Sequence, residues 1–173
     1  MEQPVFIGLG ALHGDRLRNM SRALESLESL GLRIEEASSL YETEPVGLPG
    51  AGPLLNAAVR GATDLPPEEV MAICLRTEAM LGRPARRSLA GPRPIDLDVL
   101  FLGDSVIDRA GLQVPHPRLH TRRFVLEPLA EIAAGFTHPV LGVDVATLLR
   151  RCKDTAWVRA AARPESWWPP ERA

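Results

Sequence analysis

Two aspartates separated by one residue, Asp96 and Asp98, lie inside the apolar segment 95–102. Because side chains alternate across a strand, both carboxylates would project from one face, about 6.5–7 Å apart along the backbone. Carboxylates buried without a cation are costly, and oxygen ligands at this spacing suit a pair of Mg²⁺ ions in phosphoryl-transfer chemistry. The motif alone favours this interpretation no more than a strand edge whose acids face water or pair with arginine.

Five arginines and one acid, Glu78, occupy positions 76–93, although the whole chain has 20 Lys plus Arg and 22 Asp plus Glu. The arginines are Arg76, Arg83, Arg86, Arg87 and Arg93. Guanidinium groups bind phosphate oxygens in pairs, and the Gly and Pro residues of 82–94 indicate a loop able to close over an anion. A charge run is more often a solvated loop, but its position directly before the aspartates favours a site for metal-bound polyphosphate.

A third group of candidate residues is the stretch VPHPRLH at 114–120. His116 and His120 are four residues apart, a spacing that would suit a metal on a helix. Prolines on both sides of His116 prevent that helix, so a two-histidine zinc site is not expected. A histidine held rigidly beside arginines such as Arg122 suits hydrogen bonding to phosphate, and a plain turn histidine is the alternative.

The composition is that of a globular domain, with 45% of the 173 residues hydrophobic, 24% charged and a formal net charge of −2. This balance argues against a general nucleic-acid or membrane binder, and no apolar run reaches the roughly 18 residues of a membrane helix. Lys153 is the only lysine, which excludes a G-x-x-x-x-G-K-[ST] phosphate-binding loop. Cys74 and Cys152 match no metal spacing, so we expect reduced, structural thiols in a cytoplasmic protein. We expect a monomer, although the sequence leaves the oligomeric state open.

The first elements expected to position these residues are a strand, a helix and a second strand. An apolar run at 5–9 followed by Gly8 and Gly10 predicts a buried strand and then a turn. A helix from Asp15 to Gly31 follows, and alternation over 32–41 predicts one strand after it. The inner face of the helix is expected to carry Leu17, Met20, Leu24, Leu27 and Leu30.

The remaining elements complete an alternating order of strands and helices. A Gly- and Pro-rich loop at 44–53 precedes a third strand at 54–62, which is expected to pair with the second, and a helix over 66–82. After the strand at 95–102 we expect a hairpin return near 112–114, a short helix around Thr121 and a last helix from Asp144. This order predicts an α+β sandwich of ferredoxin-like type, with an antiparallel sheet and helices on both faces.

Domain length allows one domain, at 1–155. The segment 156–173 would be a tail rich in Trp and Pro, with Trp157, Trp167 and Trp168. The sequence leaves open whether this tail packs on the domain or serves an interface.

Several segments resemble the family of 6-hydroxymethyl-7,8-dihydropterin pyrophosphokinases of folate biosynthesis, above all GPRPIDLDVLFLG and VPHPRLHTRRF. SSLYETEPVG, LLNAAV, PPEEV and EAMLGR also follow in the family's order, so the resemblance covers about residues 5–149. A match of ordered segments is far more specific than one motif. It implies a ferredoxin-like enzyme that transfers the β,γ-diphosphate of MgATP to the hydroxymethyl group of the pterin and releases AMP.

The resemblance also implies a role for individual residues. Asp96 and Asp98 match the ligands of two Mg²⁺ ions, with Asp96 also near the pterin, and Arg83 and Arg93 would join them in catalysis. Positions on the ATP side are Glu78, Arg83, Arg86, Arg93, Val99, His116 and Arg122. Positions in the pterin pocket are Thr43, Val46, Leu54, Asn56 and Phe124. Asn56 would hydrogen-bond the ring edge and Phe124 would stack on the ring.

This sequence departs from the family pattern in a few places. Residues 10–14 read GALHG in place of a turn with two polar side chains, and Leu54 stands where many members have an aromatic. Ala85 replaces an arginine, for which the neighbouring Arg86 would substitute, Ala90 replaces a tryptophan, and Leu75 replaces a glutamine. These changes leave the metal and phosphate positions intact and predict weaker pterin binding.

Two other functions remain open from the sequence. One is a non-catalytic ferredoxin-like binding module, for instance for RNA, although one Tyr and four Phe offer few rings on which bases could stack. The other is diphosphoryl transfer from MgATP to a different acceptor, suggested by Leu54 and Ala90.

Overall fold

The computed structural model describes residues 2–82 and 94–168. The helices are α1 (Arg16–Ser29), α2 (Pro67–Met80), α3 (Arg123–Ala133) and α4 (Val145–Arg151). The strands are β1 (Gln3–Ala11), β2 (Arg33–Ala37), β3 (Leu40–Thr43), β4 (Leu54–Thr63), β5 (Asp96–Leu102), β6 (Ile107–Arg109), β7 (Leu112–Val114) and β8 (Val158–Ala162). Single 3-10 turns lie at Leu119–Thr121 and Pro164–Ser166.

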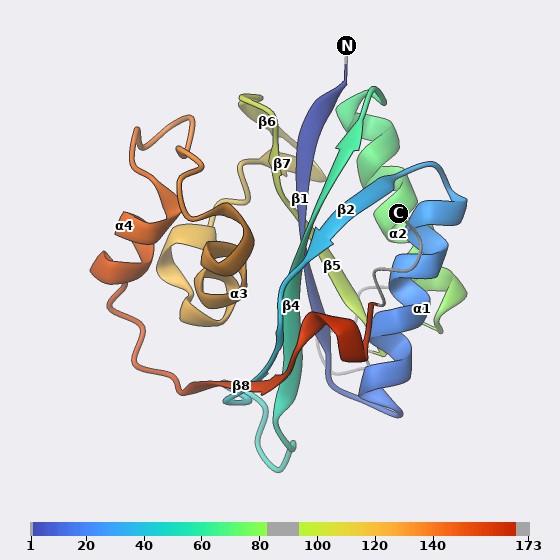
Figure 1. Cartoon of the computed structure of the whole chain (residues 1–173), viewed down its shortest axis with the longest axis vertical. Coiled ribbons are helices and arrows are strands. Elements are labelled where there is room, and N and C mark those ends of the chain that lie inside the picture. The colour runs from blue at the N-terminus through green and yellow to red at the C-terminus, as the bar shows by residue number, and fades with distance from the viewer. Residues whose placement is uncertain (1, 83–93, 169–173) are drawn as a thin grey trace.

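The main sheet stands between two helical layers, with α1 and α2 on one face and α3 and α4 on the other (Figure 1). Its strand order is β5-β1-β4-β3-β8, and β2 also pairs with β4. Every pairing is antiparallel. The prediction of an antiparallel sheet covered on both faces is therefore confirmed. The expected return at 112–114 does form a hairpin, but β7 pairs with β6 in a small separate sheet.

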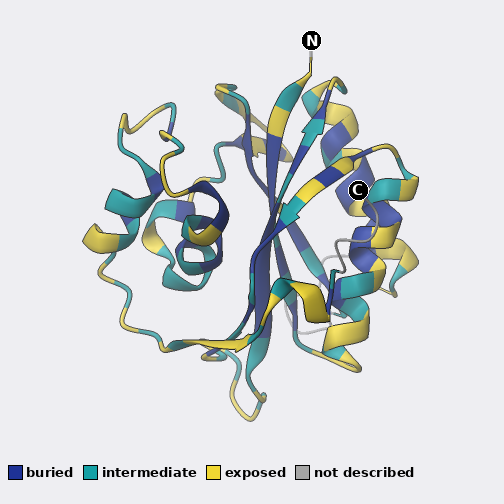
Figure 2. Ribbon diagram, in the orientation of Figure 1, coloured by how far each residue is buried: buried dark blue, intermediate teal, exposed yellow. Residues whose placement is uncertain are grey.

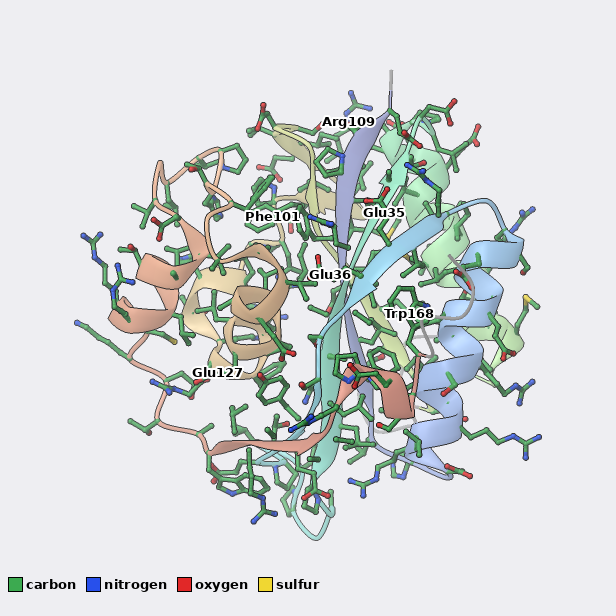
Figure 3. All side chains as sticks on the ribbon, viewed as in Figure 1. Glu35, Glu36, Phe101, Arg109, Glu127 and Trp168 are labelled. Atoms are coloured by element: carbon green, nitrogen blue, oxygen red, sulfur yellow. The ribbon has the colours of Figure 1, made fainter. Side chains whose placement is uncertain are left out.

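Each face of the sheet has its own apolar core, visible as the buried strands and inner helix faces in Figure 2. One core packs α1 and α2 on the sheet, and the other packs α3 and α4 around Phe6 and Phe101. Figure 3 shows Phe101 on the α3 side and Trp168 on the α1 side. Leu17 was predicted to face inward but is 44% exposed, so the packed face of α1 begins at Met20 in its second turn.

The N-terminal strand is longer than predicted. β1 does not turn at Gly8 and Gly10 but continues to Ala11 between β4 and β5. A Cβ at Gly8 would lie 3.4 Å from the Leu100 side chain, and one at Gly10 would lie 3.0 Å from Asn56 Oδ1. Glycine at these positions reflects close packing inside a strand and not a turn.

The stretch at 32–41, predicted as one strand, is divided into β2 and β3. The break is at Ser38, which is fully buried. Its backbone N–H donates to the Ala58 carbonyl (2.9 Å), and its hydroxyl accepts from the Ala58 N–H (3.0 Å). This exchange keeps the backbone of β4 hydrogen-bonded where the neighbouring chain bends, which alternation of side chains could not reveal.

The C-terminal tail packs on the rest of the chain as far as it is described. β8 adds an edge strand to β3. Beyond it Trp167 is 3% exposed, and its indole Nε1 donates to the Ser38 carbonyl (3.1 Å). None of the described helices is long and apolar enough to cross a membrane.

The two cysteines are both free thiols. Cys74 is buried in α2. Its burial is the main cause that raises the pKa of its thiol to about 12, and the nearby charge of Glu78 adds to the effect. A thiol held protonated in this way is a packing group, as predicted.

Candidate functional site

A cavity of about 550 Å³ lies over β1, β4 and β5, and the stretch from His116 to Val125 forms another wall. Most of the predicted site residues that the structure describes line this one cavity: Val46, Leu54, Asn56, Glu78, Asp96, Asp98, His116, Arg122 and Phe124. Thr43 and Val99 do not line it. The predicted residues Arg83, Arg86 and Arg93 lie outside the described residues.

The paired aspartates project from β5 into the cavity. Leu97 and Val99 alternate with them and are buried in the core shared with α1 and α2, so the carboxylates share one face as predicted. Across the sheet, Asp96 is opposite Gly10 and Asp98 is opposite Gly8. Neither glycine contributes a side chain beside these carboxylates.

Glu78 connects α2 to the strand that carries the aspartates. It is 4% exposed, and its Oε1 accepts a hydrogen bond of 2.8 Å from the backbone N–H of Leu97, the residue between the two aspartates. A charged acceptor makes this one of the stronger kinds of hydrogen bond. Glu78 therefore fixes the backbone of β5 at the point where both carboxylates emerge.

His116 faces Asp98, with Nε2 and Oδ1 3.8 Å apart. Its backbone N–H donates to the Leu100 carbonyl (3.0 Å), and its Nδ1 accepts from the Arg118 N–H (3.2 Å). The hydrogen-bond network thus assigns the ring proton to Nε2, on the Asp98 side. Burial lowers the pKa of His116, Arg122 and Arg118 lower it further, and Asp98 acts in the opposite direction. On balance the pKa of the ring is lowered, which favours its neutral form.

Two arginines approach the same cavity from the stretch that follows His116. Arg118 and Arg122 both line it, and Arg118 was not among the predicted site residues. Burial lowers the pKa of the Arg122 guanidinium, and the nearby charge of Arg118 lowers it further. Like charges held together at a partly buried wall favour an anion between them. Arg118 and Arg122 thus bring two cations to this cavity from the described part of the chain.

An amide and several apolar side chains also line the cavity. Asn56 is 5% exposed, and its Nδ2 donates to the Thr43 hydroxyl at 2.6 Å. Thr43 therefore orients the amide of Asn56 without lining the cavity. Leu54 and Phe124 line the cavity as well, and so does Val46, which is 68% exposed.

Sequence reasoning missed some cavity residues, among them Gly8, Gly10, Arg118 and Asp154. Glycines two apart in a strand, like the two aspartates, were a usable signal for an open face. Arg118 could have been found beside His116. Asp154 had no local signal, because it reaches the cavity from the far end of the chain.

Comparison with known proteins places the chain in a family. The family model described as 7,8-dihydro-6-hydroxymethylpterin-pyrophosphokinase (HPPK) matches residues 6–134. The 2-amino-4-hydroxy-6-hydroxymethyldihydropteridine pyrophosphokinase of Aquifex aeolicus is 39% identical over 136 residues, 79% of this chain and 84% of that protein. The Bacillus subtilis protein of the same name is 40% identical over 133 residues, 76% of this chain and 79% of that protein.

Some relatives are longer, and this chain spans less than half of their length. A folate synthesis bifunctional protein of Arabidopsis thaliana is 40% identical over 130 residues, which is 75% of this chain and 27% of that protein. The crystal structure of wild-type Plasmodium falciparum HPPK-DHPS shares the fold, with a TM-score of 0.69 at 13% identity over 87% of this chain and 45% of that chain. Because the family model and the bacterial relatives cover most of its length, the chain belongs to the 7,8-dihydro-6-hydroxymethylpterin-pyrophosphokinase family.

Proposed function

We propose that this chain transfers a diphosphate group from ATP to the hydroxymethyl group of 6-hydroxymethyl-7,8-dihydropterin. The hydroxyl oxygen attacks the β-phosphorus, and the bond from that phosphorus to the oxygen bridging to the α-phosphate breaks. AMP leaves with the electron pair, and the hydroxyl proton is released. The observation that carries this proposal is a single cavity that is lined by two carboxylates, an imidazole, two arginines, an amide and a phenyl ring.

Mg²⁺ fits the donor set at Asp96 and Asp98. Among the described residues, no three His, Cys, Asp or Glu side chains gather into a ready metal cage. Mg²⁺ is usually held by one or two carboxylates together with substrate phosphates, so this pair is sufficient. We propose two ions, which would neutralise charge on the triphosphate when bound.

His116, Arg118 and Arg122 are proposed to hold the phosphates. Together with the two aspartates they form what we call the nucleotide end of the cavity. Nε2 of His116 donates a hydrogen bond, and the guanidinium groups supply fixed positive charge. Diphosphoryl transfer requires that the reacting groups are aligned and that the negative charge of the phosphates is neutralised. Fixed polar and charged side chains of this kind supply the alignment and the neutralisation. We propose that no covalent enzyme intermediate forms. Arg83, Arg86 and Arg93 are proposed to add to this charge.

Asn56, Leu54, Val46 and Phe124 form what we call the pterin end. Asn56, oriented by Thr43, would hydrogen-bond the edge of the pterin ring. Phe124 would stack on one face of the ring, and Leu54 would pack against the other. Asp96, which belongs to the nucleotide end, is also proposed to lie near the reacting hydroxyl of the pterin.

We also propose that the chain acts as a monomer in the cytoplasm. The test is to incubate the protein with MgATP, with and without the hydroxymethyl-dihydropterin, and to measure AMP. AMP that forms only with the pterin supports the proposal. AMP independent of the pterin, or no AMP, contradicts it, and AMP formed only with another hydroxymethyl compound would assign a different acceptor.

A further inference from the structure

Asp154 reaches the cavity from outside the part of the chain that the family model matches. The match ends at residue 134, whereas Asp154 follows α4 and still lines the cavity. It is 31 residues from Arg123, whose backbone N–H donates to Asp154 Oδ2 at 3.0 Å. The carboxylate thus caps the start of α3 from a distant segment.

The start of α3 needs this cap because its own sequence provides none. Arg122 occupies the N-cap position without a side-chain hydrogen bond, and the first turn contains no acid. Two arginines, Arg122 and Arg123, instead stand at the positive end of the helix dipole, where cations are unfavourable. The start of α3 is therefore unfavourable by its own sequence, and the Asp154 carboxylate from a distant segment stabilises it.

Asp154 makes further bonds that fix it in place. Its Oδ1 accepts from the Ala156 N–H (3.0 Å), and its backbone carbonyl accepts from Arg123 Nε (3.3 Å). Both carboxylate oxygens therefore accept backbone hydrogen bonds, one of them from α3 and the other within the tail. Its charge also acts on Arg122 in the direction that favours the guanidinium cation, as does that of Asp98.

The residues on either side of Arg123 are the ones proposed to contact both substrates. Arg122 belongs to the nucleotide end and Phe124 to the pterin end. The guanidinium carbon of Arg122 also lies over the Phe124 ring, 5.5 Å from its centroid. The backbone N–H of Arg123, which donates to Asp154, therefore lies between Arg122, proposed to bind phosphate, and Phe124, proposed to stack on the pterin.

The segment after Asp154 is anchored to the sheet, which makes it a rigid support. The Glu44 N–H donates to the Trp157 carbonyl (3.1 Å), and the Trp157 N–H donates to Glu44 Oε2 (3.2 Å). β8 then pairs with β3, and Arg159 forms an ion pair of 3.0 Å with Glu42. Figure 1 shows the chain running from α4 past α3 to this edge strand.

We propose that Asp154 is a positioning residue of the active site, which sets Arg122 and Phe124 for the nucleotide and the pterin by capping α3 from the β8 segment. This role rests on the proposed function, since the substrates are those of the diphosphoryl transfer. Asp154 acts through the helix start and not by contact with the reacting atoms. Its removal should therefore weaken the binding of both substrates.

The test compares Asp154→Ala with Asp144→Ala. Asp144 caps α4 by accepting from the Thr147 N–H at 2.7 Å and does not line the cavity, so its loss is a matched cap deletion away from the site. We expect both variants to lower the melting temperature. Only Asp154→Ala should raise KM for MgATP and for the pterin, each by about tenfold, with a smaller change in kcat. Asp154→Asn, which keeps one acceptor oxygen, should be intermediate.

Binding measurements separate this proposal from the proposed function. Calorimetry with the Mg²⁺ complex of α,β-methylene-ATP, which cannot release AMP, should show weaker binding to Asp154→Ala than to Asp144→Ala. Equal binding by these two variants, or equal KM values, overturns the role of Asp154. If Asp154→Ala does not fold, the same comparison with Asp154→Asn decides. A parent chain that binds this analogue but forms no AMP overturns the proposed function and leaves the comparison of variants valid.

Discussion

The nucleotide end and the pterin end of the cavity are constructed by different means. At the nucleotide end, the groups are charged or strongly polar and lie on short stretches of sequence, with Asp96 and Asp98 on β5 and His116 just after β7. At the pterin end, Asn56 is oriented by Thr43 on a neighbouring strand, and the space beside its amide exists because residue 10 is glycine. One end depends on charge and the other on shape.

This difference predicts how each end responds to substitution. A hydrogen bond or ligand bond to a charged group contributes several times more than one apolar contact, so single changes at the nucleotide end should abolish turnover. Each apolar contact at the pterin end contributes little free energy, so single substitutions there should change the affinity for the pterin only modestly.

The largest effect is expected for Asp98→Asn. A neutral amide is a poor ligand for Mg²⁺ that carries polyphosphate, so AMP formation should fall at least about a hundredfold, a loss of ~2.7 kcal/mol or more. The melting temperature should stay near that of the parent, because the side chain is 53% exposed. Asp104→Asn, a change at an exposed position just after β5, is the control. A normal rate for Asp98→Asn at saturating Mg²⁺ would refute its role.

Glu78→Ala should reduce both stability and activity. The substitution leaves the buried N–H of Leu97 without the Glu78 carboxylate, which costs about 1–3 kcal/mol of unfolding free energy, measured by urea denaturation. Turnover should fall as well, since β5 loses its attachment at the aspartates. Glu78→Gln keeps an acceptor oxygen and should lose less of both. If Glu78→Ala is as stable and active as the parent, this bond does not hold β5.

Gly10→Ala tests whether shape controls the pterin end. The added methyl group would meet Asn56 Oδ1 at 3.0 Å, closer than ordinary contact, so the amide must shift. We expect pterin binding to weaken several-fold, roughly 1 kcal/mol, while MgATP binding is retained. Gly135→Ala, where a methyl group meets no atom within 4 Å, is the matched control. Loss of MgATP binding alone would contradict the division of the cavity into two ends.

Leu54→Tyr should give an effect of similar size to Gly10→Ala but of opposite sign, a gain in pterin affinity. A second aromatic wall would add about 0.5–1.5 kcal/mol to pterin binding, which is a several-fold to roughly tenfold tighter Kd, and leave MgATP unchanged. Titration calorimetry with each ligand measures both. Unchanged or weaker pterin binding would mean that Leu54 does not face Phe124 across the ring.

The fold was largely predictable because its signals are local. The cap at Asp15, the stop at Gly31 and the cap at Asp144 are all present as predicted. The errors arose where tertiary packing overrides local pattern: β1 continues through Gly8 and Gly10, and the stretch at 32–41 breaks at a buried serine. In both places the deciding neighbour lies on another strand.

The candidate site follows the same division. Asp96, Asp98 and His116 could be named from sequence because charged residues in an apolar strand or between prolines are rare and conspicuous. Thr43 was named, but its place behind Asn56 could not be derived, since that depends on the pairing of β3 with β4. Asp154 could not be named at all, because only the path of the chain beyond α4 returns it to the cavity.

The central claim is that one cavity holds MgATP and the pterin so that two phosphates move together. The most direct measurement follows ATP labelled at its γ-phosphate in a reaction with the hydroxymethyl-dihydropterin. The account predicts that the label appears in the pterin product, with one AMP formed per labelled pterin. Formation of ADP in place of AMP, or release of the label as free phosphate or diphosphate, would contradict it.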